Sequence, residues 1–232
     1  MHIHYFQHAN FEHVGSIKNW ANENGHQMTG TKTFESTDFP DLDEIDFLVI
    51  MGGPQSAIDY QDTPYLVEEI TYIQKAITAN KMIIGVCLGA QLLAIATGGK
   101  ALKSPHKEIG LFPIKLNEDG LKDPVFSQFN QTKIDTFHWH SDMCIPSTKY
   151  KILASTDGCP NQVFSNGKNI YGLQCHFEFT KFGIEDLVKN SIEDFEGNEA
   201  YVTTAEKMLA FDTSAVNLNM HRILEAMINL NQ

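Results

Sequence analysis

The chain has 232 residues, 42% of them hydrophobic, and its 17 Lys and Arg against 29 Asp and Glu give a net charge of −12. This length fits one α/β domain, and the hydrophobic share is too high for a disordered chain. The negative charge disfavours DNA or RNA as a partner. No run approaches the roughly 18 apolar residues of a membrane helix, and the N-terminus lacks a secretory signal. We therefore expect a cytoplasmic protein with neither a membrane nor a nucleic-acid partner.

The first half of the chain alternates short apolar runs with segments of helical periodicity. The expected elements are, in order, a strand over 2–6, a helix over 14–22, a strand over 46–51, a helix over 65–79, a strand over 82–86 and a helix over 88–96. Nearly continuous apolar strands that alternate with helices indicate a parallel sheet covered on both faces. Ligands of such sheets bind beyond the carboxyl ends of the strands, so the turns after Met51 and Val86 are candidate sites.

The second half is richer in strands and ends in helical periodicity. Strands are expected over 109–116, 152–155, 162–164 and 170–175, with turns at Asp157-Gly158 and Asn166-Gly167. No repeat or linker interrupts the chain. We predict one domain over residues 1–232: an α/β fold with a mostly parallel central sheet flanked by helices, extra strands in the second half and a helical C-terminal extension from about residue 182.

The segment Gly85-Val86-Cys87-Leu88-Gly89-Ala90-Gln91 passes from a strand to a helix at one cysteine. Glycines two residues before and after Cys87 permit the tight elbow that exposes a nucleophile. The helix N-terminus favours a thiolate, and its free N–H groups can bind an oxyanion. The alternative is a buried structural cysteine beside two packing glycines.

The four cysteines show no paired spacing, which favours free thiols in a reducing compartment. They are Cys87, Cys144, Cys159 and Cys175. Free cysteines are most often small buried residues, so we expect the three apart from Cys87 to be inert.

A thiolate nucleophile needs a base, and the base needs a group that orients it. His176 and Glu178 follow the apolar run of the last expected strand and lie two residues apart, which places both side chains on one face of a strand. Cys175 and Phe177 should then point into the core. Alone, a His-x-Glu pair on a strand is common and is usually part of a polar surface.

Together these segments resemble the class I, or triad, glutamine amidotransferases, and most of all the stand-alone proteins similar to the amidotransferase domain of GMP synthase. The motifs occur in the family's order between about residues 45 and 180. They are the turn Gly52-Gly53-Pro54, the elbow GVCLGAQ, Lys107-Glu108-Ile109-Gly110, Trp139-His140-Ser141-Asp142 and the segment GLQCHFE over 172–178. Phe177 departs from the proline that many members carry between the catalytic His and Glu, but the spacing is unchanged.

The resemblance implies a flavodoxin-like fold, hydrolysis of the glutamine amide through a γ-glutamyl thioester, and no metal or organic cofactor. It assigns catalysis to Cys87, His176 and Glu178, the oxyanion hole to the N–H groups of Gly53 and Leu88, and substrate binding to Gly52, Gln91, His140 and Asp142. The substrate would be L-glutamine or another γ-glutamyl compound. No phosphate-binding loop of an ATP-pyrophosphatase follows Glu178, so a synthase or ligase would be a separate subunit.

Other patterns have simpler interpretations. His138, His140 and Asp142 match the start of a zinc-hydrolase motif, but Met143 stands where a further ligand would follow. The alternating histidines near the N-terminus are interpreted as polar residues of a strand, and the apolar stripes after residue 205 as core, with a partner-docking face as the alternative. Acidic residues near residue 195 are interpreted as a solvated loop face; they are Glu193, Asp194, Glu196 and Glu199.

Three functions remain open from the sequence. The chain is an amidotransferase subunit that feeds ammonia to a synthase, a self-sufficient hydrolase of γ-glutamyl amides or peptides, or a redox-sensing or chaperone-like relative that uses Cys87 as a sensitive thiol. The first two share every residue named above and differ in partner dependence. A sensor needs no oriented base, so the His176-Glu178 pair argues against the third. The oligomeric state is not indicated.

Overall fold

Two apolar strands at the middle of the sheet show how the sequence produces this fold. In the computed structural model, which describes residues 1–197 and 199–231, β3 (Phe47–Ile50) and β4 (Met82–Val86) are buried at every position. They pair in parallel, with Val49 opposite Ile84. Such a pair has no solvent face, so helices must cover both sides of it.

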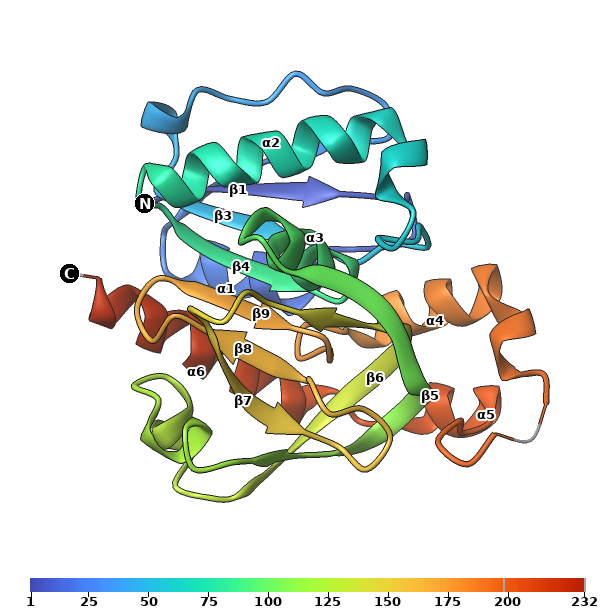
Figure 1. The fold of residues 1–232 in the computed structure, drawn as a ribbon. Coiled ribbons are helices and arrows are strands. Elements are labelled where there is room, and N and C mark those ends of the chain that lie inside the picture. The colour runs from blue at the N-terminus through green and yellow to red at the C-terminus, as the bar shows by residue number, and fades with distance from the viewer. Residues whose placement is uncertain (198, 232) are drawn as a thin grey trace.

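Within the described residues the strands form one nine-stranded sheet in the order β2-β1-β3-β4-β9-β8-β7-β5-β6 (Figure 1). The other strands are β1 (His2–Gln7), β2 (Gln27–Lys32), β5 (Lys100–Leu116), β6 (Lys133–Ile145), β7 (Lys151–Ser155), β8 (Val163–Ser165) and β9 (Ile170–Leu173). From β2 to β9 the neighbours are parallel, and from β9 to β6 they are antiparallel. The parallel half carries the strand ends at which ligands of α/β sheets bind.

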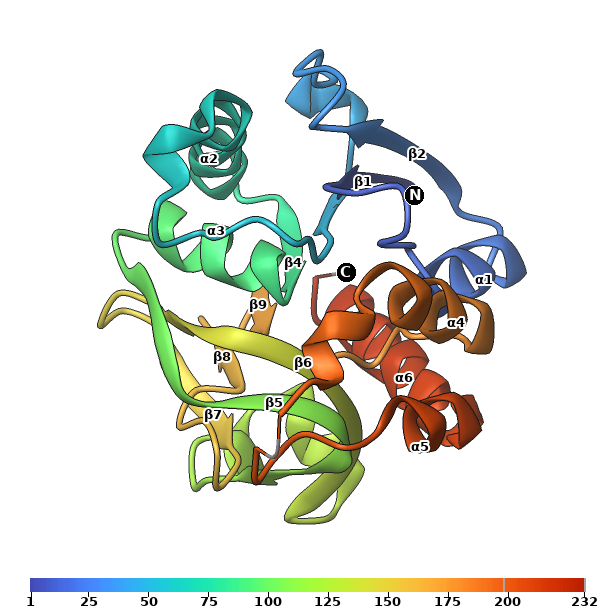
Figure 2. The ribbon, with the colours of Figure 1, turned by 90° about the vertical axis from the view of Figure 1, so that its right-hand side faces the viewer.

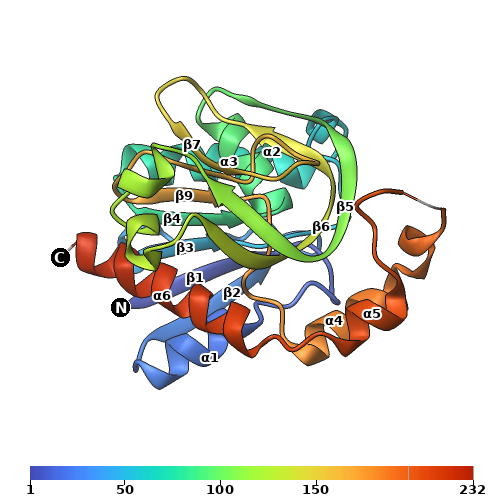
Figure 3. The same cartoon turned by 90° about the horizontal axis from the view of Figure 1, so that it is seen from below.

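Helices α2 and α3 cover one face of the sheet, and α1 and α6 cover the other (Figure 3). The helices are α1 (Ser16–Glu23), α2 (Pro64–Thr78), α3 (Leu88–Ala96), α4 (Lys181–Asn190), α5 (Ala205–Ala210) and α6 (Ser214–Leu230), with short 3₁₀ helices η1 (Leu42–Glu44), η2 (Tyr60–Asp62), η3 (Gly120–Lys122), η4 (Phe126–Phe129) and η5 (Ile192–Phe195). Each face has its own buried apolar cluster. Across the described part of the chain, no helix combines the length and apolar character needed to span a membrane.

The expected α/β fold class is confirmed, and β4 and α3 have the predicted bounds. The antiparallel share of the sheet is larger than predicted because the long strand β6 was missed and β5 begins at Lys100 rather than Ile109. β2 was also missed. Its sequence QMTGTK is polar and mostly exposed at the sheet edge, so it carries no apolar alternation. β9 ends at Leu173, two residues earlier than predicted.

The helical C-terminal extension is present as α4, η5, α5 and α6, while residues 196, 197 and 199–204, between η5 and α5, are not helical. Residues 198 and 232 of the predicted extension lie outside the described part of the chain. α6 packs on the same face as α1, whereas α4 lies at the end of the molecule toward which β1 runs (Figures 1 and 2). The helical character after residue 182 is thus confirmed, and the single domain over 1–232 stays a prediction.

Candidate active site

Cys87 forms the turn between β4 and α3, as the sequence predicts. It is the N-terminal cap of α3 and has a φ of 51° and a ψ of −110°, a region that side chains other than glycine rarely adopt. A Cβ on Gly89 would come within 2.1 Å of the carbonyl oxygen of Ile50, so only glycine permits this close packing of the helix on β3. The strained elbow places the thiol at the carboxyl ends of the parallel strands.

The imidazole of His176 and the carboxylate of Glu178 are joined by a 2.7 Å hydrogen bond between Nδ1 and Oε1. Both side chains are buried, and within the described residues Nε2 of His176 has no hydrogen-bond partner. Burial acts to lower the pKa of His176, but the Glu178 carboxylate and the Cys87 thiol outweigh it and hold the pKa well above its ordinary value. The ring is thus oriented through one nitrogen and free at the other.

Contrary to the sequence prediction, this pair does not stand on β9. The backbone of His176 instead bridges to Phe137 of β6, with His176 N donating to Phe137 O at 2.8 Å and the reverse bond at 3.0 Å. Thr136 adds a 2.7 Å hydroxyl bond to the carbonyl of His176. Cys175 and Phe177 point into the core as predicted, because this bridge keeps the segment extended after the strand has ended.

The catalytic candidates meet at one side of the GGP turn. A Cβ on Gly52 would lie 3.2 Å from Glu12 Oε2 and 3.5 Å from both Cys87 Cβ and His176 Cε1, so Cys87 and His176 lie against the same glycine. The thiol also contacts Gln174, whose Nε2 is 3.7 Å from Sγ, and the carbonyl of Trp139 at 3.6 Å. Cys87 retains 8% exposure and opens into a cavity of about 360 Å³.

The N–H groups of Gly53 and Leu88 are the two candidate oxyanion donors. Leu88 is the first residue of α3, where backbone N–H groups have no partner within the helix. Neither N–H makes a hydrogen bond among the residues that the structure describes. Gly53, Leu88 and Cys87 line the same cavity, so both candidate donors border the space next to the thiol.

The four residues predicted to bind substrate have different surroundings. Gly52 borders Cys87, as described above, and Gln91 is buried in the cavity wall, where its Nε2 donates to Gln174 Oε1 at 3.3 Å. Asp142 also lines the cavity and pairs with Lys103 at 2.6 Å. These placements bring Gly52 and Gln91 close to Cys87, whereas the carboxylate of Asp142 is engaged by Lys103.

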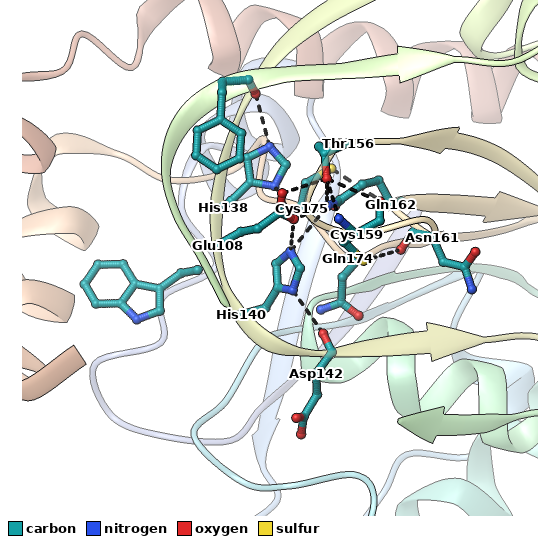
Figure 4. Close-up of polar contacts among 12 residues, drawn as sticks. Glu108, His138, His140, Asp142, Thr156, Cys159, Asn161, Gln162, Gln174 and Cys175 are labelled. Carbon is teal, nitrogen blue, oxygen red and sulfur yellow. Dashed lines mark hydrogen bonds and ion pairs between the residues drawn. The ribbon is translucent and has the colours of Figure 1, made fainter. Parts of the chain in front are cut away.

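His140 lines the cavity and belongs to a buried cluster of polar side chains (Figure 4). Its Nδ1 faces the carbonyl of Asp142 at 3.0 Å, and its Nε2 faces Glu108 Oε2 at 3.1 Å. Glu108 also accepts 2.6 Å hydrogen bonds from Thr156 and Gln162. Because both ring nitrogens of His140 are engaged, the ring supports the wall and offers no free atom to a ligand.

The same cluster contains the one set of donor atoms, among the described residues, that is close enough to hold a metal ion. Glu108, His140 and Cys159 each offer an atom within 4.8 Å of the others. His138 stacks on Phe112 and gives Nε2 to the Phe112 carbonyl, and burial lowers its pKa to about 3. His138, His140 and Asp142 therefore do not converge on one set of metal ligands. The hydrogen bonds described above already satisfy the side chains of Glu108 and His140.

Sequence reasoning missed the contacts that hold η5 against the cavity. Asp194 of η5 accepts from Lys107 Nζ at 2.7 Å and from Trp139 Nε1 at 2.8 Å, and Phe195 packs edge-on against the Trp139 ring. The interpretation of Asp194 as a solvated loop residue is therefore wrong. No local signal could have revealed it, because Lys107 and Asp194 are 87 residues apart. Glu12, also missed, lines the cavity beside the catalytic candidates, and burial raises its pKa.

Comparison with known proteins shows which family this chain resembles. The model of glutamine amidotransferase class-I matches residues 14–191. A glutamine amidotransferase-like protein of Salmonella typhimurium, YfeJ, is 35% identical over 97% of this chain and 96% of its own length. A glutamine-hydrolysing GMP synthase subunit of Sulfurisphaera tokodaii is 31% identical over 66% of this chain and 78% of its own. A glutamine amidotransferase structure from Thermotoga maritima has the same fold, with a TM-score of 0.87 over 98% of both chains at 20% identity.

Proposed function

The chain belongs to the class-I glutamine amidotransferase family, and from that premise we propose that it hydrolyses the side-chain amide of glutamine with Cys87 as nucleophile. The family supports glutamine amide hydrolysis in general. The residues, the intermediate and the fate of the ammonia are the parts that we propose here.

In the first half-reaction the Cys87 thiolate attacks the side-chain carbonyl carbon of glutamine. The N–H groups of Gly53 and Leu88 donate to the oxygen as it becomes an oxyanion. The intermediate collapses when His176, oriented by Glu178, gives its Nε2 proton to the departing nitrogen. Ammonia leaves, and a γ-glutamyl thioester remains on Cys87.

In the second half-reaction water replaces ammonia. His176, now neutral at Nε2, removes a proton from water as the water attacks the thioester carbonyl. The same two N–H groups stabilise the second oxyanion. The thiolate leaves as glutamate forms, and the imidazole regains its proton, so the enzyme returns to its starting state.

The observation that carries this proposal is the arrangement of His176. Its Nδ1 is fixed by Glu178 at 2.7 Å, its Nε2 has no partner within the described residues, and Gly52 lies against both His176 and Cys87. A redox sensor or a chaperone has no use for a base oriented in this way. An acyl-transfer enzyme requires it.

We further propose that the ammonia is consumed by a separate synthase or ligase. Support comes from the relative whose name describes one subunit of GMP synthase. The alternative, a self-sufficient γ-glutamyl hydrolase, uses the same residues and differs in needing no partner. A reducing compartment suits the free thiol of Cys87, so we propose the cytoplasm as the location and one domain as the unit that carries the reaction.

The test is ammonia release by the purified chain from glutamine, γ-glutamyl peptides and γ-glutamyl polyamines, with Cys87→Ala as the control. The proposal expects glutamine turnover that disappears in Cys87→Ala. A slow rate confined to glutamine indicates the feeder subunit, and rapid hydrolysis of peptides or polyamines indicates the self-sufficient hydrolase. Equal turnover by the wild type and Cys87→Ala would contradict both.

A further inference from the structure

A second imidazole–carboxylate pair lies behind the GGP turn and takes no part in the steps above. His8 follows β1 directly, Glu69 comes from α2, and both side chains are fully buried. His8 Nε2 is 3.0 Å from each carboxylate oxygen of Glu69. On the other side of the ring, His8 Nδ1 is 3.1 Å from the carbonyl oxygen of Gly52. The ring thus connects α2 to the turn that borders the nucleophile.

The partners of His8 determine its protonation. A carbonyl oxygen only accepts hydrogen bonds, so Nδ1 must carry a proton toward Gly52, and an ionised carboxylate only accepts, so Nε2 must carry one toward Glu69. Burial acts to lower the pKa of His8, but Glu69, the Gly52 carbonyl and Glu12 together raise it. The contact with Gly52 therefore requires a proton on Nδ1 of His8, and both ring nitrogens are engaged by neighbours.

The bond to Gly52 has a consequence for the neighbouring N–H. The carbonyl of Gly52 and the N–H of Gly53 belong to one planar peptide group, and in a trans peptide they point in opposite directions. No cis peptide occurs among the described residues. The bond that directs the Gly52 oxygen toward His8 therefore directs the Gly53 N–H away from His8. Gly53 lines the cavity that contains Cys87, and its N–H makes no hydrogen bond within the described part of the chain.

The two glycines explain why such an anchor is needed. Glycine adopts both signs of φ with similar ease, so a peptide between two glycines can rotate at little cost. Unanchored, the Gly53 N–H would be directed at the cavity for only part of the time. An oxyanion hole depends on donors that are already oriented before the reaction begins.

We propose that His8, held by Glu69, is a positioning residue for the oxyanion hole: by binding the Gly52 carbonyl it fixes the Gly53 N–H toward the reacting carbonyl. The inference rests on the proposed function, in which Gly53 supplies one oxyanion donor. It assigns to His8 and Glu69 a role in the rate of the chemical step rather than in substrate affinity.

Two amide substitutions of His8 separate its two bonds. The amide nitrogen of asparagine replaces Nδ1 and can still donate to Gly52, whereas that of glutamine replaces Nε2 and can still donate to Glu69. Both remove the same charge. We expect His8→Gln to lower kcat for glutamine by about 10- to 100-fold, because a displaced donor costs somewhat less than a deleted one. His8→Asn should stay within about threefold of wild type, and KM should change little in either variant.

His2→Asn is the matched control, because His2 also gives Nδ1 to a backbone carbonyl, that of Glu44, at the opposite end of β1. It should leave kcat unchanged. The inference is overturned if His8→Gln and His8→Asn have the same kcat, or if their losses lie in KM. Should a variant not fold, ¹⁵N NMR of the wild-type ring decides: a protonated Nδ1 supports the inference, and a bare Nδ1 refutes it.

A second substrate separates this inference from the proposed function. Acylation of Cys87 by p-nitrophenyl acetate passes through an oxyanion at the same thiol but needs no glutamine site. If the wild type does not hydrolyse glutamine but reacts with the ester, the glutamine proposal is refuted. The ratio of the ester rates of His8→Asn and His8→Gln still tests the positioning role in that case. A ratio near one would refute it.

Discussion

His176 Nδ1 and Glu178 Oε1 lie 2.7 Å apart although β9, the strand that leads to them, ends at Leu173. The backbone bridge between His176 and Phe137 of β6 keeps the segment extended, so the two side chains share a face without belonging to a ladder. The orientation of the base is therefore set by a strand of the antiparallel half of the sheet, whereas the nucleophile stands on the parallel half.

Removing the charge of Glu178 tests whether it orients the base. In Glu178→Gln the amide can present a donor to Nδ1, which favours the wrong tautomer of His176. We expect kcat to fall by about 10³- to 10⁴-fold with KM nearly unchanged. Glu185→Gln, on the exposed side of α4, is the control and should retain full activity. A loss of less than about threefold in Glu178→Gln would show that the carboxylate is not part of the mechanism.

The raised pKa of His176 predicts how stability depends on pH. Because the folded protein holds the His176 proton more tightly than the unfolded chain does, the stabilisation is complete below the ordinary pKa of 6.5 and is lost as the pH rises through the folded value. The free energy of unfolding of the wild type should therefore decrease above pH 6.5. His176→Asn removes this contribution, so its denaturation curves should show a shallower decrease. Parallel slopes for the two proteins would contradict the assignment.

Asp194 is expected to affect substrate affinity rather than chemistry. In Asp194→Asn the pair with Lys107 loses its charge, and η5 is held less firmly against the cavity. Partly exposed ion pairs contribute up to about 1 kcal/mol, so KM for glutamine should rise by about two- to fivefold at constant kcat. Glu196→Gln makes the same charge change on an exposed neighbour and should leave KM unchanged. A fall in kcat without a change in KM would disprove the role in holding η5 against the cavity.

The sequence predicted the elbow well because its signals are local. Two glycines flank Cys87, and the apolar run before it is buried at every position, so β4 and α3 begin and end where expected. The strands that were missed lack such local signals. β2 is polar and mostly exposed, and the strand nature of β6, which supports His176, was not recognised.

No local sequence pattern indicated the residue pairs that connect distant elements. His8 and Glu69 are 61 residues apart, and Lys107 and Asp194 are 87 apart. The histidines near the N-terminus were interpreted as polar strand residues, although His8, which directly follows β1, is buried and ion-paired. Only the packing of α2 beside the end of β1, and of η5 over the cavity, brings these pairs together. Their roles follow from tertiary structure alone.

The most direct test of the account is the identity of the atom that carries the substrate during turnover. Wild-type protein should be mixed with glutamine, quenched in acid within one turnover, digested and analysed by mass spectrometry, with Cys87→Ser as the matched control. The account predicts one γ-glutamyl group as a thioester on the peptide that contains Cys87, formed as fast as ammonia is released. Ammonia release without this adduct, or an adduct on Cys144, Cys159 or Cys175 instead, would contradict it.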